Sequence, residues 1–225
     1  MGEYLPERKV TSEAARKFLH AMFAAAPGLR VQVVTFTGRP SQWFADPEEA
    51  AQWIAGIKHA PGWTRHGRAL AHIIREAKKQ PIHAAVVLTD AVELRGRGNP
   101  DGDVMEEVCK QAIRLRRLGC TVDFGYKGTI RGGCPIDRAG PHAEQRIKEI
   151  AEDGGGCAFL YDPADAGFAK RFAQIATRAA LVAKGNTVGA RLLLEHLQAV
   201  PFHMNVVGEQ VPSAKCASAQ AGDEG

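Results

Sequence analysis

Two side chains with oxygen donors stand at boundaries between predicted elements of this 225-residue chain. Thr64 lies in the glycine-flanked segment 62–67, just before an apolar pattern at helical spacing, and Asp90 follows the buried-type strand 84–88 and Thr89. In open parallel sheets, ligands bind outside the carboxyl ends of the strands. Hydroxyl and carboxylate oxygens are ligands that suit Mg²⁺ or Mn²⁺. The sequence therefore predicts a metal site at this sheet edge, with Thr64 and Asp90 as ligands.

Each of these residues also has a structural interpretation. Thr64 could be a helix N-cap, and Asp90 could form the turn at the end of a strand. Arg95 and Arg97 lie on the loop after Asp90. They are either solvated or placed to contact an acidic partner.

Other candidate groups point away from catalysis. Asp101 and Asp103 lack the alternating ligands and closing Glu of a calcium loop, so we interpret them as helix caps. His66 and His72 do not form a His-Glu-x-x-His pattern, and Cys134 has no evident base beside it. The five cysteines include no Cys-x-x-Cys pair, which favours reduced thiols over a zinc or redox site. We expect no enzymatic activity.

The elements that must position Thr64 and Asp90 alternate along the chain. Runs of β-branched and apolar residues alternate with apolar stripes at helical spacing. This order predicts an α/β fold with a doubly wound, mostly parallel sheet and helices on both faces. Strands are expected at 29–36, 41–44, 82–88, 120–126 and 157–161, and helices at 6–26, 46–58, 67–79, 103–118, 142–152 and 162–182. One domain should cover 1–184, an amphipathic helix 185–207 and a disordered tail 208–225.

Taken together, the strand 29–36, Thr64 with Gly67, and the run Leu88-Thr89-Asp90 resemble the von Willebrand factor A-type domain family. The resemblance covers about residues 1–182. It implies a metal-ion-dependent adhesion site, in which the ion keeps one coordination position for an acidic side chain of a bound protein. The implied function is a metal-dependent protein-interaction module, an adaptor for an ATPase or a stress-response complex. The family often has Gly where Ala91 stands.

The Asp-x-Ser-x-Ser loop, which such a site also needs, is absent from the sequence. Met1-Gly2 resembles the end of that motif. We therefore expect the codons before Met1 to encode an apolar strand that ends in Asp-x-Ser-Gly-Ser. In the family this strand lies between the strands expected at 29–36 and 82–88. With two protein ligands, the chain as given should bind metal weakly, and without the strand it should fold poorly or pair those two strands directly.

An alternative function is metal-assisted hydrolysis of phosphoesters or esters by Asp90 at the same edge, although no Asp-x-Asp nucleophile is present. The net charge of +4 is spread along the chain, which argues against nucleic-acid binding. No apolar run is long enough for a membrane span, and no export signal follows Met1. The expected location is the cytoplasm.

Overall fold

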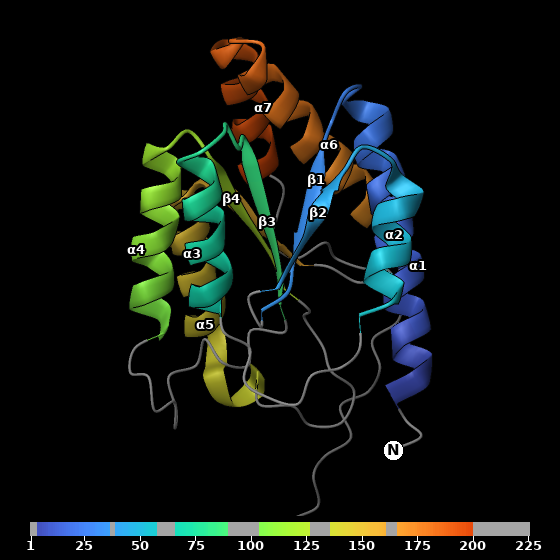
Figure 1. Ribbon diagram of the computed structural model, residues 1–225. Coiled ribbons are helices and arrows are strands. Elements are labelled where there is room, and N and C mark those ends of the chain that lie inside the picture. The colour runs from blue at the N-terminus through green and yellow to red at the C-terminus, as the bar shows by residue number, and fades with distance from the viewer. Residues whose placement is uncertain are drawn as a thin grey trace, which may run out of the picture.

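The computed structural model describes residues 4–36, 39–57, 66–89, 104–126, 136–160 and 166–199 (Figure 1). Within these ranges the chain forms seven helices and five strands, largely in the expected alternation. Their order is α1 (Tyr4–Ala25), β1 (Val31–Val34), β2 (Pro40–Phe44), α2 (Pro47–Ala55), α3 (His66–Ala77), β3 (Ala84–Thr89), α4 (Val104–Arg117), β4 (Thr121–Tyr126), α5 (Ile136–Asp153), β5 (Gly155–Leu160), α6 (Ala166–Ala183) and α7 (Thr187–Ala199).

The described strands form two sheets. Strands β3, β4 and β5 make a parallel sheet in that order, with Ala85 opposite Val122 and Phe124 opposite Ala158. Strands β1 and β2 make an antiparallel pair, in which Val31 lies opposite Phe44. The protein is therefore a mixed α/β fold with a parallel and an antiparallel sheet. The direct pairing of β1 with β3, which we considered for a chain without the additional strand, does not occur.

Helices cover both faces of the parallel sheet. Side chains alternate along each strand, so each face presents its own set of apolar residues to the helices. On one face Ala85 and Val87 pack in a core with residues of α3, α4 and α5, among them Leu70, Leu115 and Ile150. On the other face Ala84, Val86 and Leu88 pack with Phe18 and Met22 of α1 and with Phe172 and Ile175 of α6. Each face thus has its own apolar layer.

The hairpin of β1 and β2 packs on α1 and α2. Val31 and Val33 contact a core that contains Leu19, Phe44 and Ala50. Figure 1 shows α1 and α2 on the outer side of this hairpin and α3 and α4 on the opposite side of the molecule. Strands β1 and β3 run in the same direction, from the end where α1 finishes to the end where α3 begins.

Two of the boundaries that differ from the sequence prediction have a clear local cause. Helix α5 begins at Ile136 and not at residue 142, so Pro141 lies inside the helix. The glycines after α5 do not all belong to a turn, since Gly155 begins β5 with φ of +73° and Gly156 continues it. A Cβ atom at Gly156 would clash with the carbonyl oxygen of Val122. This glycine therefore allows β5 to approach β4 closely.

Helix α7 lies within the range 185–207, where a helix was expected, and it packs against α6 and β5. Arg171 of α6 donates to the carbonyl oxygen of Leu197 over 3.1 Å, and Gln198 donates to that of Gly156 over 2.9 Å. The tail expected at 208–225 lies outside the described residues. Of the helices that the structure describes, none has the length and apolarity to cross a membrane.

Candidate functional site

The four residues that the sequence singles out, Thr64, Asp90, Arg95 and Arg97, lie outside the described residues. Two of them, Thr64 and Asp90, lie close in sequence to described elements. Helix α3 begins at His66, two residues after Thr64, and β3 ends at Thr89, directly before Asp90. Both of these ends lie at the same end of the molecule (Figure 1).

The other candidate groups serve as packing residues where they are described. His66 is buried and its ring lies 4.6 Å from that of Phe36, centroid to centroid. His72 is also buried, and its Nε2 lies 3.1 Å from Oε1 of Gln32. Among the described residues, no group of three or more His, Cys, Asp or Glu side chains could hold a metal ion. Asp101, Asp103 and Cys134 lie outside those residues.

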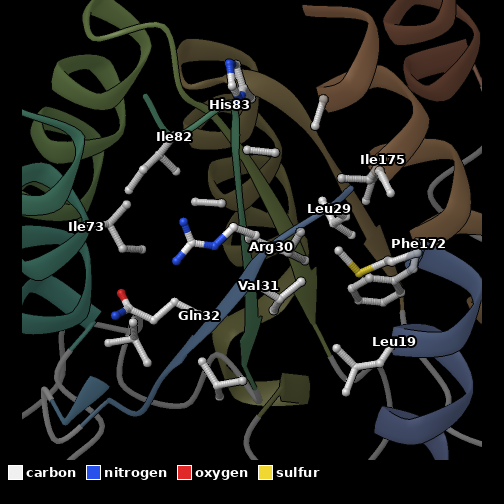
Figure 2. A pocket seen from close by; sticks show the side chains of 18 of the residues that line it. Leu19, Leu29, Arg30, Val31, Gln32, Ile73, Ile82, His83, Phe172 and Ile175 are labelled. Atoms are coloured by element: carbon white, nitrogen blue, oxygen red, sulfur yellow. The ribbon is translucent and has the colours of Figure 1, made fainter. Parts of the chain in front are cut away.

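A large apolar cleft separates the two sheets. It has a volume of about 700 Å³ and runs between β1 and β3. One wall is formed by α1 and α6, and the opposite wall is formed by α3 (Figure 2). Leu19, Phe172 and Ile175 are fully buried within the first wall, whereas the half-buried Ile73 of the second wall points into the cleft.

Strand β3 borders the cleft with its free edge. The amide of Thr121 donates to the carbonyl oxygen of His83 over 3.1 Å, so His83 presents its backbone groups to β4. Backbone groups of successive strand residues point to opposite edges, and those of Ala84, Val86 and Leu88 therefore face the cleft. In the described part of the chain, no strand pairs with this edge.

Strand β1 borders the cleft in the same way. Its amides at Val33 and Thr35 donate toward β2, to Oγ of Ser41 over 2.9 Å and to the carbonyl oxygen of Arg39 over 3.1 Å. The backbone groups of Gln32 and Val34 consequently point away from β2, and no described strand pairs with β1 on that side. The cleft thus lies between two strand edges that run in the same direction.

A cleft of this size is unusual inside a protein. Protein interiors have few voids larger than a water molecule, whereas ligand sites are mostly apolar clefts of about 300 to 1,000 Å³. With a volume of about 700 Å³, this cleft has the size of a binding site.

Sequence reasoning missed a second feature, a buried polar cluster on β4. Asp123 and Arg178 form an ion pair whose side chains are 0% and 2% exposed. Arg178 also donates to Oγ1 of Thr121 over 2.9 Å, and the amide of Cys157 donates to Asp123 over 2.9 Å. Burial, followed by the charge of Asp123, raises the pKa of the Cys157 thiol. The cluster joins α6 to β4 and β5, and its thiol is held in the unreactive protonated form.

A signal for this cluster was present in the sequence. Asp123 interrupts an apolar strand between Val122 and Phe124, and Arg178 interrupts the apolar face of α6. Charged residues are almost never fully buried unless they are paired. The two positions were therefore candidates for mutual contact.

Comparisons with known proteins add no relative to this picture. No protein-family model matches the chain, and neither a curated protein nor a solved structure is significantly similar to it.

Proposed function

We propose that the chain is a metal-dependent protein-interaction module of the von Willebrand factor A type, acting in the cytoplasm. In this proposal the parallel sheet of β3, β4 and β5, with helices on both of its faces, carries the binding edge at the carboxyl ends of its strands. The observation that carries the proposal is the position of two described ends. The start of α3 and the end of β3, which adjoin Thr64 and Asp90, lie at the same end of the molecule.

The chemistry of the edge follows from the residue types. The hydroxyl of Thr64 and the carboxylate of Asp90 would hold Mg²⁺ or Mn²⁺ together with water molecules. The ion would supply a Lewis-acidic coordination position for an Asp or Glu side chain of the partner. Arg95 and Arg97 would add charge-assisted hydrogen bonds to the same acidic surface. An ATPase or a component of a stress-response complex is the proposed partner.

Metal binding tests the proposed edge. Mn²⁺ titrated into the chain and followed by electron paramagnetic resonance should show weak, saturable binding that Asp90→Asn removes, because this substitution deletes the charged ligand. Glu93→Gln, which neutralises a carboxylate three residues further along the chain, is the matched control and should bind like the parent. Equal binding by the parent and Asp90→Asn would exclude Asp90 as a ligand.

Partner capture tests the function itself. An immobilised acidic peptide should retain the chain when Mg²⁺ is present and release it in excess chelator. Capture that persists in chelator would contradict a metal-mediated contact. Hydrolysis of a generic phosphoester that Asp90→Asn abolishes would instead indicate an enzyme.

A further inference from the structure

The cleft between β1 and β3 has borders and walls that suit one kind of ligand. We propose that it binds a single extended, apolar peptide strand from another polypeptide, which pairs with β1 on one side and with β3 on the other. The bound strand would join the two described sheets into one. This inference concerns the interior of the sheet and does not depend on the proposed metal site.

The two borders identify the ligand as a strand. Residues Val86 and Leu88 of β3, and Gln32 and Val34 of β1, direct their backbone groups toward the cleft from opposite sides. An added strand satisfies donors and acceptors on both edges, which is how proteins bind peptides by β-augmentation. A helix satisfies its own backbone groups internally and would leave both edges unpaired. The six residues of β3 set the length of the strand, about 20 Å at roughly 3.3 Å per residue.

The two walls determine the composition of the strand. Alternate side chains of an inserted strand would face α1 and α6, where half-buried Met22 and Ala180 line the cleft, and α3, where half-buried Ile73 lines it. Both walls are apolar, so the strand must be apolar at successive positions, as buried parallel strands are. The small residues Ala176, Ala179 and Ala180 on α6 leave room for branched side chains on that side.

A labelled peptide tests the proposal directly. The probe is Val-Val-Ile-Val-Leu-Val with two lysines at each end for solubility, and its fluorescence anisotropy is measured against the full chain. Saturable binding of one peptide per chain is expected. Replacing the third and fifth apolar residues by proline removes two amide donors, and this peptide should bind at least about tenfold more weakly. A peptide of alternating Val and Lys should bind equally poorly, because only one of its faces is apolar.

Matched variants test the location. Ala180 is half-buried and lines the cleft, whereas Ala173 is half-buried on the same helix and does not. Ala180→Leu should weaken binding at least about tenfold, since the added side chain occupies the space of the strand. Ala173→Leu should leave it unchanged. Ala183→Trp, at an exposed position that also lines the cleft, gives a second obstruction with little risk to folding.

Amide hydrogen exchange tests whether the peptide pairs with both strands. The bound peptide should protect amides of both β1 and β3. Absence of peptide binding, equal binding of the proline peptide, or insensitivity to both obstructing variants would overturn the proposal. It would also be overturned if a fatty acid bound with the same response to the variants while the peptide did not, or if the chain alone formed a dimer that protected both edges.

Discussion

At the scale of single residues, the interior contains charge that the apolar pattern of the sequence conceals. Asp123 and Arg178 are both almost fully buried and paired. Removal of one partner of a buried pair typically costs about 3 to 5 kcal/mol, because the other charge stays buried without compensation. The pair joins α6 to the central strand of the parallel sheet, and α6 also forms one wall of the cleft. The cluster therefore holds that wall in place.

His72 links the stability of the protein to pH. Burial lowers its pKa from the ordinary value, although nearby Glu76 acts in the opposite direction. The folded protein therefore favours the neutral ring, with Nε2 beside Oε1 of Gln32. A depressed folded-state pKa means that protonation favours unfolding. The stabilising effect of the neutral ring is complete above the unfolded-state pKa of about 6.5 and declines as the pH falls below it.

We predict that His72→Gln loses less thermal stability than the parent between about pH 7.5 and about pH 5.5. The glutamine does not titrate, and its side chain can still form a hydrogen bond with Gln32. Thermal unfolding followed by circular dichroism measures the difference. The control His196→Gln changes an exposed histidine near the end of α7 and should keep the acid sensitivity of the parent. Identical pH profiles for the parent and His72→Gln would show that His72 does not carry the effect.

At the scale of the elements, a capping signal in the sequence predicted the start of α2 correctly. Asp46 precedes Pro47, and its Oδ1 accepts hydrogen bonds from the amides of Glu48 and Glu49 over 2.7 and 3.1 Å. In the sequence, Asp46 followed by Pro47 predicts this helix start, and the structure confirms it. These bonds satisfy two of the amides that a helix start leaves without intrahelical partners.

Loss of this cap should cost a measurable amount of stability. We predict that Asp46→Ala lowers the free energy of unfolding by about 1 kcal/mol, which corresponds to about 2 to 4 °C in Tm for a chain of this size. Asp46→Asn keeps the acceptor and should retain most of the stability. If both variants lose the same amount, the side-chain charge and not the cap geometry is responsible.

Sequence patterns predicted most elements because each has a local cause. Apolar spacing predicts α3, and β-branched runs predict β1 and β3. Helix α5 was predicted too short because its first turns contain Pro141 and follow a glycine-rich stretch, and local rules favour a boundary there. The cleft could not be deduced from these rules, since its walls come from α1, α3 and α6, which lie far apart in the sequence. The metal ligands Thr64 and Asp90 remain predictions.

At the scale of the whole molecule, the described strands form two sheets with the cleft between them. Strands β1 and β3 run in the same direction on either side of the cleft, and helix walls cover it above and below the sheet plane. A strand in the cleft that runs parallel to both neighbours would end where α1 begins (Figure 1). Connection through α1 to β1 would then be a β-α-β unit, which in proteins is almost always right-handed.

We predict that a chain extended before Met1 by six apolar residues and Asp-Gly-Ser-Gly-Ser unfolds at a higher temperature than the 225-residue chain. The added strand would bury apolar surface against α1, α3 and α6 and pair both free edges. The extended chain should also stay monomeric and bind Mg²⁺ more tightly, because the new loop adds oxygen ligands beside Thr64 and Asp90. Calorimetry and light scattering measure these changes.

Two control extensions separate the contributions of strand and loop. Changing only the Asp of the added loop to Ala should keep the gain in Tm and remove the gain in Mg²⁺ affinity, since the strand still fills the cleft. Placing two prolines in the added strand should remove both gains, because the strand no longer pairs with β1 and β3. A sharp unfolding transition and tight metal binding by the 225-residue chain alone would contradict this account. Stabilisation by the attached strand, without binding of the free peptide, would show that the cleft accepts a strand only when it is joined to α1.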